Sequence, residues 1–178
     1  MTPAGPAPAA PPGLTYREAG ATRAGPLPPG YRHLRVRTLV GYGPGAFAAA
    51  RAAVMDWRMH RAVGVTIETA GPVAVPGLRV VVGLGAGRLR LRAPCAVVWT
   101  MAEERRAGFG YGTLRGHPQA GEEAFAVSLE QDASVVLTVT AFSRPAAWYT
   151  RAAGPLVPAF QRAYARRCGR VLLRLVRE

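Results

Sequence analysis

The chain has 178 residues, of which 49% are hydrophobic, and it carries a formal net charge of +13. A chain of this length can bury a core large enough to fold as one stable domain. It contains no run of about 18 apolar residues, so the sequence predicts no transmembrane helix.

The first 13 residues consist mainly of alanine and proline. Such residues bury too little apolar surface to offset the entropy lost on ordering, so we expect a disordered tail over residues 1–13, followed by one domain over 14–178. The tail also lacks the positively charged start and leucine-rich centre of a secretory signal peptide. We therefore expect the protein to be cytoplasmic.

The next segments predict a strand followed by a helix. Residues 14–30 are expected to be irregular because prolines and glycines interrupt them. Over residues 32–40 apolar and polar side chains alternate, which is typical of a half-buried strand. Residues 44–59 show helical spacing, and Pro44 suits the start of a helix because a first-turn residue needs no N–H donor.

Six further strands are expected from short apolar runs separated by turn residues. Their connections are too short for crossovers, so the strands should pair in antiparallel hairpins. Residues 145–176 then return to helical spacing, and their prolines leave one long helix from about residue 158. The six expected strands span residues 63–69, 78–84, 88–100, 106–113, 122–129 and 135–142.

This order of elements predicts an α+β fold. A curved antiparallel sheet of about seven strands has a concave face that must be covered, and one long amphipathic C-terminal helix can cover it. The sequence shows neither an internal repeat nor a second domain.

The segment 111–125 concentrates the groups that could carry chemistry. Its sequence, Tyr-Gly-Thr-Leu-Arg-Gly-His-Pro-Gln-Ala-Gly-Glu-Glu-Ala-Phe, places His117 five and six residues before Glu122 and Glu123. A carboxylate beside an imidazole can raise its basicity, so these three residues are the candidate catalytic groups. Alternatively, they only stabilise the turn. Consecutive strand residues point to opposite faces, so at most one glutamate can face a cavity.

Other aromatic and polar residues are candidates for ligand contacts. Most aromatics must belong to the core, but Trp and Tyr can pack against a ligand while offering a polar tip. Trp57 and His60 share one helical face, which could reach a cavity mouth or simply end the helix. Arg144 could bind an anionic group or flank a helix start. The predicted ligand-binding residues are Trp57, His60, Trp99, Tyr111, Thr113, Phe142, Arg144 and Trp148.

We expect no metal and no cofactor. Cys95 and Cys168 are far apart and have no spaced Cys or His neighbour, so they are best interpreted as buried or unreactive thiols. A metal site would need His60, His117 and a carboxylate to converge, and nothing in their spacing indicates that they do.

Several stretches resemble an uncharacterised family called domain of unknown function 1990, or UPF0548-like. The resemblance covers residues 16–175, and the 111–125 motif is its most specific part. This family is similar to the START-like and pollen-allergen-like proteins of the helix-grip (SRPBCC) superfamily, in which a curved sheet wraps around a long C-terminal helix. The resemblance implies a hydrophobic ligand cavity. The stretches that carry it are 27–31, 57–60, 92–95, 108–125 and 142–149.

Three functions remain open from the sequence. The first is binding of a small hydrophobic or amphipathic molecule between the sheet and the C-terminal helix. The second is an enzyme such as a cyclase, dehydratase or hydrolase of a small metabolite, with His117 and Glu122 or Glu123 as acid–base groups. The third is a basic module for nucleic acid or an acidic membrane surface. All 23 basic residues are arginines spread along the chain, which is typical of solvated faces, so we do not expect a nucleic-acid partner.

Overall fold

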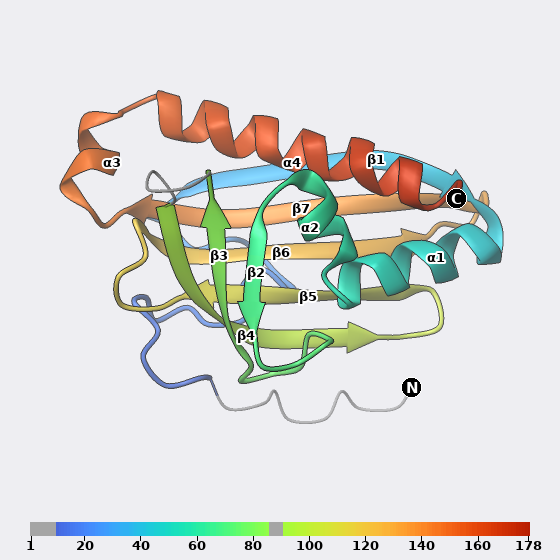
Figure 1. The fold of residues 1–178 in the computed structure, drawn as a ribbon, viewed down its shortest axis with the longest axis horizontal. Helices are drawn as coiled ribbons and strands as arrows, with labels where there is room; N and C mark the ends of the chain where they lie inside the picture. Colours follow the sequence, from blue (N-terminus) through green and yellow to red (C-terminus); the bar gives the residue numbers. More distant parts are fainter. Residues whose placement is uncertain (1–9, 86–90) are drawn as a thin grey trace.

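The computed structural model describes residues 10–85 and 91–178, which form a seven-stranded antiparallel sheet with helices on one side (Figure 1). The strand order β1-β7-β6-β5-β4-β3-β2 places the first strand beside the last, and the other neighbours follow the chain. The strands are β1 (Arg32–Tyr42), β2 (Thr66–Thr69), β3 (Arg79–Leu84), β4 (Leu91–Ala102), β5 (Arg106–Thr113), β6 (Gln119–Leu129) and β7 (Ser134–Pro145). The helices are α1 (Gly43–Met55), α2 (Arg58–Val63), α3 (Trp148–Ala152) and α4 (Leu156–Leu175).

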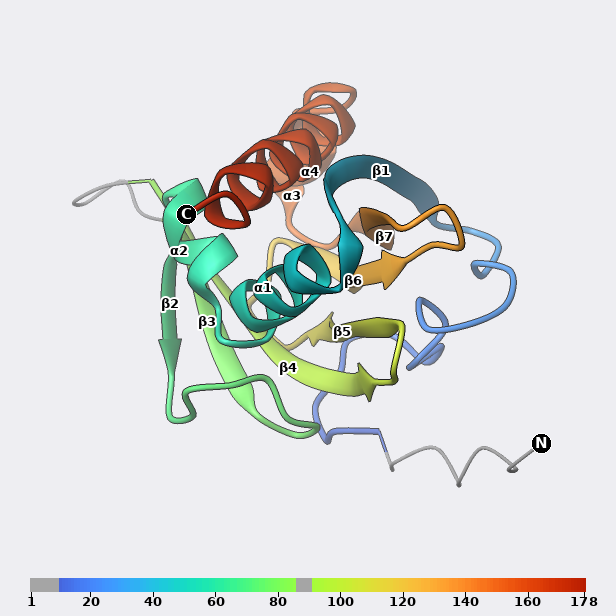
Figure 2. The ribbon, with the colours of Figure 1, turned by 90° about the vertical axis from the view of Figure 1, so that its right-hand side faces the viewer.

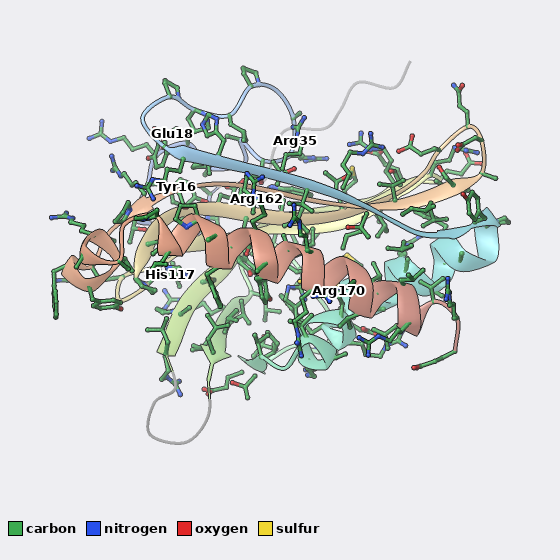
Figure 3. All side chains as sticks on the ribbon, turned by 90° about the horizontal axis from the view of Figure 1, so that it is seen from above. Tyr16, Glu18, Arg35, His117, Arg162 and Arg170 are labelled. Carbon is green, nitrogen blue, oxygen red and sulfur yellow. The ribbon has the colours of Figure 1, made fainter. Side chains whose placement is uncertain are left out.

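The sheet separates two layers of different character. Figure 2 shows it curving around α1, α2 and α4, and Figure 3 shows α4 and the N-terminal segment on opposite sides of it. Side chains of the concave face form the main hydrophobic core with these helices. A smaller apolar cluster on the convex face packs against the N-terminal segment. This is the α+β arrangement that the order of elements predicts.

Alternation along β6 assigns its side chains to the two faces. Phe125 and Val127 belong to the main core on the concave face. Ala124 belongs to the convex cluster. The two glutamates that precede them therefore point in opposite directions, with Glu123 on the concave face and Glu122 on the convex face.

The single helix expected over 44–59 is wrong. Helix α1 ends at Met55, and Trp57 adopts a left-handed backbone with φ of 67°. A left-handed residue cannot continue a right-handed helix, so the chain turns before α2 begins. Asp56 supports the new start by accepting the N–H of Arg58 at 3.1 Å.

Several expected boundaries also shift. Helix α2 ends at Val63 and is followed by Gly64, which has φ of 101°, so only Thr66–Thr69 of the expected strand 63–69 are extended. Strand β7 continues through Pro145, which therefore does not open a helix. The expected strand over 88–100 is described only from Leu91 onward.

The N-terminal segment covers the convex face, where the sequence predicts only irregular structure. Alternate glycines of β5 leave room for it, because a Cβ at Gly110 would collide with the Trp99 indole and one at Gly112 with the Tyr16 hydroxyl. Of the expected disordered tail, residues 1–9 lie outside the described residues. The segment is thus an ordered part of the fold from residue 10 onward.

Helix α4 packs closely on β1. A Cβ at Gly169 would collide with the Thr38 side chain, so glycine permits this approach. The outer side of α4 carries exposed arginines, among them Arg162 and Arg170. Arg35 of β1 lies on the other side of the sheet, so these arginines do not form one surface (Figure 3). Within residues 10–85 and 91–178, no helix is both long and apolar enough to cross a membrane.

Candidate functional site

A cavity of about 350 Å³ lies between the concave face of the sheet and the first half of α4. Strands β3 to β7 form one wall, the β5–β6 hairpin borders one end, and α3 with α4 forms the other wall. Its surface is mainly apolar. The apolar side chains include Val82, Leu84 and Ala93 from the sheet and Leu156, Val157 and Phe160 from α4.

Glu123 places a carboxyl group in this cavity. The Tyr111 hydroxyl donates a hydrogen bond to its Oε2 at 2.9 Å. The surface of Glu123 that remains accessible faces the cavity that it lines. Burial raises the pKa of this carboxyl to about 7, although the Tyr111 hydrogen bond acts in the opposite direction. Glu123 can therefore gain or lose a proton near neutral pH.

The groups around Glu123 stay neutral over the same pH range. Burial, together with the nearby Glu123 charge, raises the pKa of the Cys95 and Cys168 thiols and of the Tyr111 and Tyr164 hydroxyls. Both cysteines are free and buried. The buried Tyr164 hydroxyl makes no hydrogen bond with any described residue. In the described part of the cavity, the ionisable Glu123 carboxyl thus lies among neutral thiols and hydroxyls.

Glu122 has a different task on the convex face. Its carboxylate accepts hydrogen bonds from the Tyr16 hydroxyl at 2.7 Å, the Gly20 N–H at 2.7 Å and the Thr22 N–H at 3.0 Å. The Thr22 hydroxyl and the Trp99 indole N–H also donate to it. Glu122 is among the residues that line the cavity, but its carboxylate points to the convex face and binds the N-terminal segment to the sheet. Of the two candidate glutamates, only Glu123 presents its carboxyl to the cavity.

His117 lines the cavity and also closes the hairpin turn. Its Nδ1 lies 2.9 Å from both the N–H and the carbonyl oxygen of Gln119, so it accepts from the first or donates to the second according to the tautomer of the ring. Burial lowers the pKa of His117 to about 4, so the ring is neutral at pH 7. No hydrogen bond joins His117 to Glu122 or Glu123 among the described residues, and its catalytic role stays a prediction.

Trp57 and His60 lie in the core and not at the cavity mouth, which corrects their expected position. His60 is fully buried and packs edge-on against Phe125, with a centroid separation of 4.5 Å, and against Trp57 at 5.7 Å. Burial lowers its pKa to about 3. Neither ring nitrogen has a partner in the described part of the chain. The pair therefore closes the inner end of the concave face.

Two further candidates direct their rings away from the cavity, although Phe142 is among the residues that line it. The Trp99 indole lies on the convex face, where it donates to the Thr22 hydroxyl at 3.0 Å. The Phe142 ring packs edge-on against Tyr16 and Tyr31 on the same face. These aromatics were expected to line the cavity, but strand parity directs them to the N-terminal segment.

The remaining candidates lie at the edges of the site. The guanidinium of Arg144 is exposed and stacks over the Tyr31 ring at 5.0 Å. Thr113 lines the cavity, and its hydroxyl accepts the Gly121 N–H at 3.0 Å. Trp148, whose side chain is 79% exposed, stands on α3 outside the cavity.

Sequence reasoning missed the polar contacts that join the helices to the hairpin. The Gln161 amide of α4 donates to the Gln119 side chain at 2.9 Å and to the Ser143 hydroxyl at 3.1 Å. The Thr150 hydroxyl of α3 donates to the Pro118 carbonyl at 2.9 Å. Single glutamines and threonines carry no periodic signal, so only the folded arrangement reveals these hydrogen bonds. We call this group of contacts the latch; its residues are Pro118, Gln119, Ser143, Thr150 and Gln161.

The arrangement offers little for a metal ion. Across residues 10–85 and 91–178, no three His, Cys, Asp or Glu side chains gather closely enough to hold one. What the cavity offers instead is an apolar surface with one carboxyl, one neutral imidazole and a few hydroxyl and amide groups.

Comparisons with known proteins match this fold and most of the chain. Residues 15–171 match the family model described as Domain of unknown function (DUF1990). A UPF0548 protein of Deinococcus radiodurans is 34% identical over 170 residues, covering 90% of this chain and 86% of that protein.

Two solved structures share the fold at low sequence identity. The structure of Ara h 8.0201 gives a TM-score of 0.57 at 13% identity and covers 83% of this chain and 98% of its own. A point mutant of norcoclaurine synthase from Thalictrum gives 0.53 at 12% identity, with coverage of 81% and 94%. The predicted helix-grip arrangement of sheet and C-terminal helix is confirmed.

Proposed function

The chain belongs to the DUF1990 family, and we propose that it binds a small apolar or amphipathic molecule in the cavity between the sheet and α4. The single observation that carries this proposal is the cavity itself. Its volume of about 350 Å³ falls within the range of small-molecule sites, which are typically apolar with a few placed polar groups.

The rim of the cavity supports the same proposal. Leu156 and Phe160 line the cavity and are 71% and 56% exposed, so apolar surface continues from the inside to the solvent. Large exposed apolar side chains beside a cavity are typical of a ligand entrance. The latch that includes Gln161 and Thr150 closes this end by only a few hydrogen bonds, each of which contributes about 1 kcal/mol. Opening this end for a ligand would therefore cost little.

The solved relatives add limited support. The norcoclaurine synthase structure is described as a complex with a transition-state analogue, so that protein accommodates a small molecule on this fold. Because the cavity of the present chain is mainly apolar, we expect its ligand to be a small hydrophobic or amphipathic molecule.

A substitution that fills the cavity should weaken binding of an apolar ligand. Replacing Val157 with tryptophan adds a large ring from the cavity side of α4, and we expect it to weaken binding of octan-1-ol at least about tenfold, because the ring occupies the volume that the ligand needs. Binding is measured by displacement of an uncharged fluorescent apolar dye from the full-length protein.

Ala159→Trp is the matched control, because Ala159 lies on the exposed side of the same helix. It should leave octanol affinity unchanged. Equal octanol affinity in both variants and the wild type, with both variants folded by circular dichroism, would contradict binding in this cavity.

A further inference from the structure

The charge of the cavity is opposite to that of the protein. The chain carries a net charge of +13. Among the cavity-lining residues of the described chain there is no arginine, whereas Glu123 directs its carboxyl inward. A ligand carboxylate placed there would meet a like charge with no described cation to offset it. The described lining of the cavity therefore disfavours an anionic ligand at Glu123.

Glu123 lies at the inner end of the cavity. It is four residues along β6 from Gln119 at the hairpin, which is about 13 Å at 3.3 Å per residue. Tyr164 is eight residues along α4 from Leu156 at the rim, which is about 12 Å at 1.5 Å per residue. Glu123 and Tyr164 both line the cavity, and Phe125 belongs to the packed core beyond Glu123 along β6.

This inner end is rich in acceptors. Tyr111 donates to Oε2 of Glu123, and no described residue donates to Oε1. The buried Tyr164 hydroxyl lies beside the Cys168 thiol, a weak partner, and makes no well-formed hydrogen bond with a described residue, so it can accept as well as donate. A group with several N–H donors and a positive charge would satisfy both.

We infer that the ligand is a lipophilic amine, whose apolar body fills the outer part of the cavity and whose protonated nitrogen binds Glu123 at the inner end. This inference rests on the proposed function, since it names the class of ligand for the same cavity. The exposed Leu156 and Phe160 side chains contact the apolar body, and Glu123 is the group that determines specificity.

The pH dependence of binding follows from the groups that face Glu123. These are Tyr111 of β5, Cys95 of β4, and Tyr164 and Cys168 of α4, and burial raises the pKa of each above its usual range. Of these described groups and Glu123 itself, only the Glu123 carboxyl, with a pKa of about 7, changes charge between pH 5 and pH 8. An alkylamine stays protonated up to about pH 10. Amine affinity should therefore rise from pH 5 to pH 8.

Three small molecules with the same eight-carbon skeleton and different polar groups test the inference. Octylamine, octan-1-ol and octanoate are titrated into the full-length protein by calorimetry at pH 5 and pH 8. At pH 8 we expect octylamine to bind at least about tenfold more tightly than octanol, and octanoate to bind more weakly than octanol. Octanol affinity should differ little between the two pH values.

A variant and its control identify the responsible group. Glu123→Gln keeps the shape of the side chain, so it should remove the advantage of octylamine while octanol affinity changes by less than about threefold. Glu104→Gln, on the exposed surface, should preserve the wild-type order.

The outcomes separate the two proposals. If octanol binds but octylamine binds no more tightly, or if octanoate binds most tightly, the amine inference is overturned and the proposed function stands. If none of the three probes binds the wild type at either pH, both are overturned. The wild-type comparison of the two pH values decides the inference even if the variant does not fold.

Discussion

Replacing Glu122 with glutamine is expected to destabilise the protein by about 2–4 kcal/mol and to loosen residues 14–22 from the sheet. The carboxylate accepts hydrogen bonds from Tyr16, Gly20, Thr22 and Trp99 on the convex face. A glutamine amide offers one acceptor oxygen and turns an N–H₂ group toward donors, so the buried Gly20 N–H or the Tyr16 hydroxyl loses its acceptor. Unsatisfied buried donors are among the costly outcomes of a point substitution.

Urea unfolding at pH 7 measures the loss of stability, and trypsin measures the release of the segment. Arg17 is exposed within it and Arg23 directly after it, and cleavage at these two arginines should become at least about tenfold faster, since 1.4 kcal/mol corresponds to a factor of ten. Glu104→Gln serves as the surface control. Wild-type stability in Glu122→Gln would show that this carboxylate does not hold the segment.

Substitution of the neighbouring Glu123 should change the free energy of unfolding in the opposite direction. Glu123→Gln is expected to stabilise the ligand-free protein at pH 8 by roughly 2–3 kcal/mol and to have little effect at pH 5. The folded protein raises the pKa of Glu123 to about 7, from 4.5 when unperturbed. Wild-type stability is therefore unpenalised below about pH 4.5 and falls as pH rises to about 7, because over this range the carboxyl of the unfolded chain ionises while the buried one keeps its proton. Glutamine never ionises and can still accept from Tyr111.

Unfolding of wild type and Glu123→Gln at several pH values between 5 and 8 gives this difference directly. Both proteins contain His60 and His117, whose pKa values burial lowers, so their contributions cancel in the comparison. A stability difference that does not vary with pH, or a variant that is less stable at pH 8, would contradict the raised pKa of Glu123.

Local patterns predicted most of the fold. Alternation of apolar and polar residues identified β1, and short turns between apolar runs required antiparallel pairing. The sequence could not place the break between α1 and α2, because Trp57 is not a residue type that favours a positive φ. It also left residues 14–30 irregular, because their order comes from tertiary contacts with Glu122 and with the glycines of β5 and not from any periodicity.

The candidate site was predictable in outline only. The motif 111–125 directed attention to Glu122 and Glu123, and the rule that strand neighbours face opposite ways predicted that the two side chains would lie on different faces. Which one faces the cavity depends on the parity of β6 relative to the core. That parity is set by Phe125 and Val127 packing under the helices. The same alternation along β4 and β7 places the side chains of Trp99 and Phe142 on the convex face.

Locating bound octan-1-ol in solution tests the proposed function most directly. With uniformly ¹³C-labelled protein and unlabelled ligand, we predict intermolecular NOEs from the octanol chain to the methyl groups of Val82, Leu84 and Val157, which line the cavity. NOEs confined to the second groove, at Leu39 and Val176 between β1 and the C-terminal end of α4, would contradict the account. So would the absence of any intermolecular NOE at saturating octanol.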